Sequence, residues 1–126
     1  MKKKTIQSFT DLKAWKEGHQ LVVLIYKITE KFPKRETYSL TDQLRKASVS
    51  ITNNIAEGFG RQTYKEKVQF YYQAKGSLVE VKNQLLVAKD VGYLKKNDFK
   101  QLAEQANNTA KLLQGLINKS KSFINR

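Results

Sequence analysis

The chain has 126 residues, of which 40% are hydrophobic, so it is long and apolar enough to bury the core of one domain and is not disordered by composition. It contains no cysteine, which excludes disulfides, zinc–thiolate sites and a cysteine nucleophile, and which suits a reducing cytosol. Lys and Arg number 24 against 11 Asp and Glu, for a net charge of +13. Such a protein attracts polyanions, and nucleic acid is the commonest, although lysine-rich faces also serve solubility alone.

Neither a signal peptide nor a membrane span is expected from the sequence. The N-terminus is basic but lacks the apolar stretch that a signal peptide needs. The longest apolar run, "LVVLIY" at residues 21–26, is far too short to cross a bilayer. We therefore expect a cytoplasmic protein with no membrane partner.

Hydrophobic periodicity predicts a first helix that begins near Thr10, capped by Ser8 or Thr10, and ends before Pro33. A proline lacks an amide proton, and its ring pushes the preceding residue out of the α region. Three- and four-residue steps predict that the inner face of this helix consists of Leu12, Trp15, His19, Val22, Tyr26 and Thr29, widened by Leu21, Ile25, Ile28 and Phe32.

Three further helices follow. The second is predicted at residues 40–58, capped by Ser39 or Thr41, and the third begins at a capping box, "TYKE" at residues 63–66. The third runs to about residue 91, where Gly92 is suited to end it, and the fourth runs from Asn97 to near residue 121. The predicted core seams of these three helices are Leu40, Leu44, Ala47, Ile51, Ile55 and Gly58; Tyr71, Ala74, Leu78, Val81, Leu85 and Ala88; and Phe99, Leu102, Ala106, Thr109, Leu113 and Leu116.

Short loops between long helices favour antiparallel neighbours, and no segment alternates with the period of a strand. The predicted fold class is all-α, an up-down-up-down antiparallel four-helix bundle. We expect a flexible basic N-terminus at residues 1–8, a single domain at 9–121 and a C-terminal tail at 122–126.

A polar edge on the second helix has two interpretations. Asn54, Glu57 and Arg61 fall beside the apolar face of that helix, and the four-residue step from Glu57 to Arg61 permits an ion pair. The first interpretation, which we favour, is a half-buried structural network that ties the end of the second helix to the start of the third. The second is a polar ligand pocket.

Catalytic chemistry finds little support in the sequence. Metal-carrying bundles use Glu-x-x-His motifs, but the single histidine is His19, and Lys16 stands three residues before it. We expect His19 to be a hydrogen-bonded core or interface histidine. The chain contains no Gly-x-Ser-x-Gly elbow and no Walker A loop. We therefore predict no enzyme activity, no catalytic residue, no metal site and no cofactor.

The third predicted helix carries two further rows with a spacing of seven residues. Tyr72, Val79 and Leu86 form an apolar row away from the core seam, and with Leu24 on the first helix they are the predicted oligomer interface. A broad core face of a monomeric bundle is the alternative. The second row consists of Lys75, Lys82 and Lys89 and is the predicted nucleic-acid-binding surface. A ring of copies would repeat this row and add avidity.

The segments "QLRKASVSITNNIAEGFGR" and "YKEKVQFYYQAKGSLVEVKNQL" make the chain resemble a bacterial family of four-helix-bundle proteins. Members are encoded in intervening sequences of large-subunit ribosomal RNA genes, and the resemblance spans about residues 8–118. Its most specific part is Asn54–Gly58 with Arg61. Mild departures are Lys46 and Ser48 in an Arg-Arg-Ala-Ala motif, Thr52 in place of Pro, and Tyr71 in place of Leu.

The resemblance implies a pentameric ring without enzymatic activity. A related branch, the accessory variability determinant of diversity-generating retroelements, is a basic pentamer that binds nucleic acid and a reverse transcriptase. We therefore expect a homo-oligomeric protein that binds the backbone of RNA or DNA without sequence specificity. Arg45, Lys46 and Arg61 are second candidates for this surface, and Lys2, Lys3 and Lys4 form a basic arm. The alternative is a protein–protein adaptor, for example for a reverse transcriptase.

Overall fold

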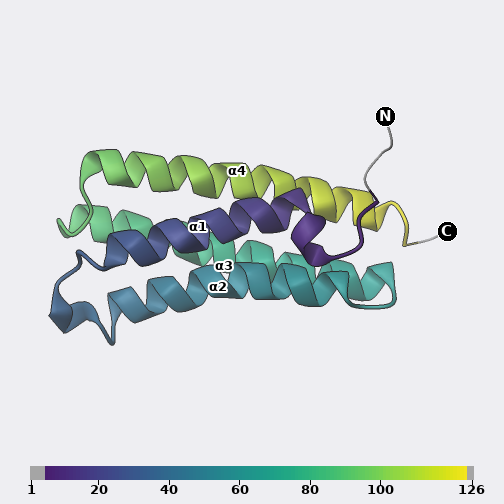
Figure 1. Ribbon diagram of the computed structural model, residues 1–126, viewed down its shortest axis with the longest axis horizontal. Helices are drawn as coiled ribbons and strands as arrows, with labels where there is room; N and C mark the ends of the chain where they lie inside the picture. The colour runs from purple at the N-terminus through teal and green to yellow at the C-terminus, as the bar shows by residue number, and fades with distance from the viewer. Residues whose placement is uncertain (1–4, 125–126) are drawn as a thin grey trace.

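The computed structural model describes residues 5–124 and consists of four long helices joined by short connections (Figure 1). The predicted basic arm at Lys2, Lys3 and Lys4 lies outside the described residues, as do the last two residues of the predicted tail. The long helices are α1 (Lys13–Thr29), α2 (Leu40–Phe59), α3 (Tyr64–Asp90) and α4 (Lys96–Lys121), and single 3-10 turns stand before α1 (η1, Phe9–Asp11) and before α2 (η2, Lys34–Glu36).

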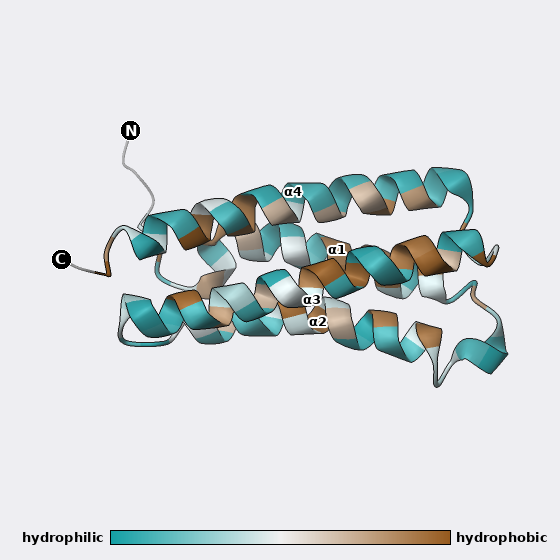
Figure 2. Cartoon of the chain, turned by 180° about the vertical axis from the view of Figure 1, so that it is seen from behind, coloured by the Kyte–Doolittle hydropathy of each residue, from teal (hydrophilic) through white to brown (hydrophobic). Residues whose placement is uncertain are grey.

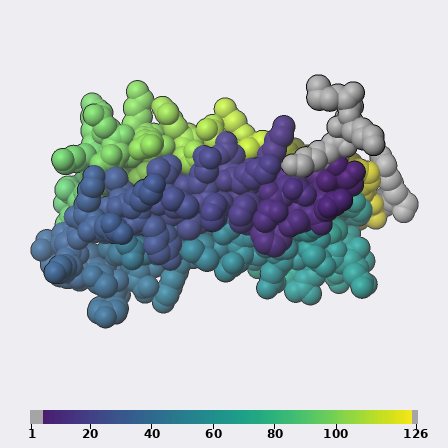
Figure 3. Space-filling view, viewed as in Figure 1, coloured from purple at the N-terminus to yellow at the C-terminus, as the bar shows by residue number. Residues whose placement is uncertain are grey.

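The helices form an elongated bundle, with the ends of α2 and α4 and the starts of α1 and α3 at one end (Figures 1 and 3). Within the described chain the backbone of α1 lies next to α2 and α4 and that of α3 next to the same two helices, whereas the diagonal pairs are not adjacent. The prediction of an all-α four-helix bundle is confirmed. No helix among residues 5–124 combines the length and the hydropathy that crossing a bilayer requires.

The helix ends differ in detail from the sequence prediction. The Ser8 hydroxyl accepts from the Thr10 amide and Asp11 accepts from the Ser8 amide, so the first turn is the separate η1 and α1 begins three residues later than expected. α4 begins at Lys96, one residue before the expected start at Asn97. Gly92, at φ +88°, ends α3 as predicted, because this left-handed conformation is accessible to glycine at low cost.

The buried face of α1 is rotated from the predicted one. Ala14, Gly18, Leu21 and Ile25 are buried, whereas His19 lies at the surface. His19 is therefore not a core histidine, and the alternative of an interface histidine stays a prediction. The reason for the rotation is that the small residues at 14 and 18 let α1 approach its neighbours closely, and periodicity of large apolar residues does not detect them. The expected faces of α2, α3 and α4 largely agree with the core. Among the residues predicted for these faces, all are buried except Leu40, Phe99 and Leu116, which are partly buried.

Glycine allows close approach at two contacts of α2. A Cβ atom at Gly18 of α1 would lie 3.3 Å from Cγ2 of Thr52. At Gly58, near the end of α2, a Cβ atom would lie 2.7 Å from Cε1 of Tyr71, so the tyrosine ring packs directly on the α2 backbone. Two residues before Thr52, the hydroxyls of Ser50 and Ser77 hydrogen-bond at 2.9 Å and join α2 to α3.

Replacing Gly58 by alanine should destabilise the fold. The new methyl group overlaps a fully buried ring that has little room to move, and overpacking of this kind costs about 1–3 kcal/mol. Gly115→Ala in α4 is the control, because nothing lies within 4 Å of its Cβ position and helix propensity favours alanine by about 1 kcal/mol. Urea denaturation measures both. Equal stabilities of Gly58→Ala and wild type would contradict the packing described.

Candidate nucleic-acid interface

Lys75, Lys82 and Lys89 lie along the side of α3 that faces α4. Residues seven apart on a helix are separated by roughly 10 Å along its axis and drift by about 20° around it. A neighbouring helix in a bundle crosses at a similar small angle. The row therefore stays beside α4 over its whole length.

At the first two positions of the row, lysines from both helices share one hollow. The Lys75 ammonium donates to Oε1 of Gln114 on α4 at 2.9 Å. Lys82 lines the same hollow, and Lys111 enters it from α4. Three ammonium groups from two helices therefore surround one depression in the surface.

At the third position the lysine is held by an aromatic ring. The Lys89 ammonium lies 4.5 Å from the centroid of the Phe99 ring on α4, and 3.9 Å from a carboxylate oxygen of Asp90. A second, larger hollow begins here, and Lys96 and Lys100 of α4 line it together with Lys89. Glu104 is the acidic residue in its lining.

We call this surface the lysine groove. Periodicity found the half on α3 and missed the half on α4. The excess charge of residues 93–126 was visible in the sequence, but nothing in it showed which side of α4 would face α3. The groove consists of Lys75, Lys82, Lys89, Lys96, Lys100 and Lys111.

Arg45 lies on the side of the bundle opposite to the lysine groove, where its side chain has a structural role. Its Nε donates to the buried hydroxyl of Thr29 at 2.9 Å, and Nη2 donates to the carbonyl of Tyr26 at 3.3 Å. Its guanidinium also lies 4.7 Å from the centroid of the Tyr26 ring. The side chain therefore ties α2 to the last turn of α1.

The other second candidates also lie outside the lysine groove, because α2 is diagonal to α4 in the described chain. Lys46 pairs with Asp42 at 3.1 Å on the outer side of α2, with 78% of its side chain exposed. Arg61 pairs with Glu57 at 3.5 Å and lies 4.5 Å above the Phe70 ring of α3. The structure therefore does not bring Arg45, Lys46 or Arg61 together with the lysine groove.

The expected three-residue polar network divides into two parts. Asn54 donates to the carbonyl and the hydroxyl of Ser50, and the Ser50 hydroxyl also hydrogen-bonds with Ser77 of α3. Asn54 is therefore part of the contact between α2 and α3. The Glu57–Arg61 pair stands apart, with 61% and 47% of the side chains exposed, so the pair is at the surface and not half-buried.

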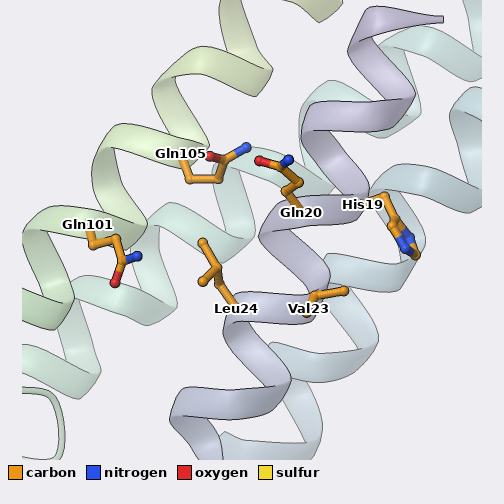
Figure 4. A pocket seen from close by; sticks show the side chains of 6 residues that line it. All are labelled: His19, Gln20, Val23, Leu24, Gln101 and Gln105. Carbon is orange, nitrogen blue, oxygen red and sulfur yellow. The ribbon is translucent and has the colours of Figure 1, made fainter.

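The apolar row of α3 is exposed, with Tyr72, Val79 and Leu86 at 42%, 60% and 45% exposure. Figure 2, in which α3 faces the viewer, shows brown hydrophobic stretches along this helix. Leu24 is not part of the same surface, because α1 and α3 are diagonal. It packs partly on the core and points toward α4, near Gln101 and Gln105 (Figure 4).

His19 lies on the side of α1 that faces away from α4 (Figure 4). Its ring stacks on Trp15, with centroids 4.7 Å apart and planes at 11°. The residues around the adjacent hollow are glutamines and aliphatic residues, which do not transfer protons. This environment gives the histidine a packing role against Trp15.

Residues 10–115 match the family model of the 23S rRNA-intervening sequence protein, so the chain belongs to this family. A crystal structure of a protein of unknown function from the S23 ribosomal protein family of Bacteroides thetaiotaomicron has a similar fold, with a TM-score of 0.77 and 16% sequence identity. The alignment covers 83% of this chain and 95% of that one. None of the curated proteins compared with the chain matches it.

Two adjacent residues of α2 allow a test of the role of Arg45. Arg45→Met should lower the free energy of unfolding by about 1–2 kcal/mol, because it removes the two hydrogen bonds that the guanidinium donates to the Tyr26 carbonyl and the Thr29 hydroxyl. Lys46→Met removes the same charge but only an exposed ion pair, so we expect a change within about 0.5 kcal/mol. Chemical denaturation measures both, and equal effects would contradict the role given to Arg45.

Proposed function

We propose that this chain is a non-enzymatic, oligomeric protein that binds the backbone of RNA or DNA through the lysine groove. The observation that supports this most is that lysines from α3 and α4 together line two successive hollows along the contact of these helices. Two rows of cations on either side of a groove match a polyanion better than the same charges scattered over the bundle.

The chemistry of the groove favours contacts to phosphate. An ammonium group is a compact charge that attracts phosphate without the fixed geometry of arginine, which reads guanine edges in pairs of hydrogen bonds. The aromatic ring in the groove, Phe99, already lies under Lys89 and is partly buried. Base stacking is therefore a minor contribution, and binding without sequence preference is the expected mode.

The proposal of a non-enzymatic role is supported by the position of the single histidine. His19 stacks on Trp15 at the surface, away from the lysine groove. The acidic groups beside the groove, Asp90 and Glu104, stand next to lysines and belong to different helices. Electrostatic attachment is the role that this combination serves best.

We also propose that the exposed row of Tyr72, Val79 and Leu86 joins copies of the chain into a ring of five, the number that the family resemblance implies. Three large apolar residues in one row on a single helix form a patch that association would cover. The lysine groove lies beside this row on α3. A ring would bring several grooves close together, and avidity would raise the affinity for a long polyanion.

A salt series tests nucleic-acid binding. Fluorescence anisotropy with a labelled RNA hairpin and a DNA duplex should show binding that weakens steeply as salt rises. The triple variant Lys75→Glu, Lys82→Glu, Lys89→Glu should weaken binding by at least about tenfold for every sequence, and should reduce the slope of log affinity against log salt by about 2–3.

The matched control for this test is Lys27→Glu, Lys31→Glu, Lys46→Glu, which changes the net charge equally at exposed positions on or next to α1 and α2. A smaller loss is expected for the control. Equal losses from the two triple variants would show that net charge alone, and not the lysine groove, determines binding.

Light scattering after gel filtration tests the ring. Five copies of the 14.6 kDa chain give a mass of about 73 kDa. Val79→Asp should reduce this mass, whereas Asn53→Asp, at an exposed position of α2, should leave it unchanged. A wild-type mass of one chain at tens of micromolar would contradict the ring.

The same exposed row supports the second candidate function, a protein–protein adaptor, for example for a reverse transcriptase. In that case the apolar row would bind a different protein and the charge would attract an acidic partner. A monomeric wild type that binds no nucleic acid even at low salt would favour the adaptor.

A further inference from the structure

A cavity of 240 Å³ lies at the end of the bundle where α2 and α4 end and α3 begins. Figure 1 shows the start of α1 at the same end. Its walls are mostly apolar, with Leu12, Phe59 and Leu116 on different elements and the Tyr64 and Phe123 rings packed together with centroids 4.9 Å apart. The cavity is smaller than the sites that hold drug-sized ligands, so it fits a small organic molecule.

Two hydroxyl groups from different helices line this apolar cavity. Tyr71 and Ser120 are 2% and 4% exposed as whole residues, and no residue among 5–124 hydrogen-bonds to either hydroxyl. Both oxygens open onto the cavity, since Gln84 Oε1 is the fully enclosed side-chain atom without a partner in that part of the chain. Polar groups nearly always find a partner, so the contents of the cavity, water or a ligand, supply it.

The position of Tyr71 is fixed by its packing. Its ring lies on the backbone of α2 at Gly58, where even a Cβ atom would approach Cε1 to 2.7 Å. The ring therefore has little freedom to turn its hydroxyl elsewhere. Burial and the neighbouring Tyr64 raise the pKa of Tyr71 to about 12, so the hydroxyl keeps its proton and is available as a donor.

Positive charge completes the lining. The Lys67 ammonium donates to the carbonyl of Phe59 at the end of α2, and lies 5.4 Å and 5.9 Å from the ring centroids of Phe59 and Tyr64. An ammonium has three donors, so two remain for a ligand. Lys119 also lines the cavity, and no carboxylate of residues 5–124 does. The cavity thus offers hydroxyl and ammonium donors to an acceptor group.

We propose that this cavity binds a small aromatic monocarboxylate. The ring of the ligand packs among the apolar and aromatic side chains, and its carboxylate accepts hydrogen bonds from Tyr71 and Ser120 beside the Lys67 charge. A phosphate or other strongly hydrated anion would make no packing contact with the apolar walls. A neutral hydrocarbon would leave the two hydroxyls without a hydrogen-bond partner. The proposal is independent of nucleic-acid binding, because the cavity and the lysine groove share no lining residue.

Titration with phenylacetate, followed by calorimetry and by amide NMR shifts of the full chain, tests the proposal. Saturable binding with a Kd on the order of 1 mM is expected for a ligand of this size. The shifts should cluster on the residues of the cavity. The neutral probe phenylacetamide and the headgroup analogue acetate should each bind at least about tenfold more weakly.

Variants identify the donors. Tyr71→Phe keeps the ring that packs on Gly58 and removes only the hydroxyl, so it should fold and bind phenylacetate about tenfold more weakly. Lys67→Met should also weaken binding. The control is Tyr72→Phe, whose hydroxyl lies outside the cavity and accepts from Lys121 at 3.3 Å, and it should bind like wild type.

Three results would overturn the proposal. The first is the absence of saturable shifts at tens of millimolar phenylacetate, which would mean that water alone satisfies the two hydroxyls. The second is equal affinity for phenylacetate and phenylacetamide, and the third is equal affinity of wild type and Tyr71→Phe.

Discussion

The close packing of α2 against α1 and α3 is the constraint on which the other surfaces depend. α2 meets α1 where Gly18 lies against Thr52, and it meets α3 where the Tyr71 ring lies on Gly58. The Ser50–Ser77 hydrogen bond also joins α2 and α3, near the Thr52 contact. Because small residues bring the backbones together, neither α1 nor α3 is free to rotate about its own axis.

Because the orientation of α3 is fixed, each row of its side chains faces a different environment. The seam that includes Ala74 and Val81 is buried, Lys75 and Lys82 face α4, and Val79 faces outward. The lysine groove and the apolar row are therefore two consequences of one helix orientation. The same packing holds the Tyr71 ring at the end of the bundle, where its hydroxyl lines the terminal cavity.

Most of the fold follows from the sequence, because large apolar residues at three- and four-residue steps mark the buried faces of α2, α3 and α4. The orientation of α1 does not, since Ala14 and Gly18 carry little hydrophobic signal although they lie at the contact with its neighbours. A prediction made without that orientation places His19 on the inner face of the helix and Leu24 on the outside of the bundle.

The site residues were predictable only where one helix contains the whole pattern. The seven-residue spacing of lysines on α3 is visible in the sequence. The partner lysines Lys96, Lys100 and Lys111 fall on one side of α4, at steps of four and eleven residues, but only the packed pair of helices shows that this side borders α3. The terminal cavity is likewise invisible, because Tyr71 and Ser120 are 49 positions apart and meet only in the fold.

The central claim is that phosphate contacts lie on both sides of the lysine groove. Chemical labelling of lysines, read by mass spectrometry with and without a bound RNA hairpin, tests this at each residue. The account predicts that RNA protects lysines of both helices, Lys75 and Lys82 on α3 together with Lys100 and Lys111 on α4, and leaves Lys27 and Lys46 as reactive as before. Uniform protection over all exposed lysines, or protection confined to α1 and α2, would contradict it.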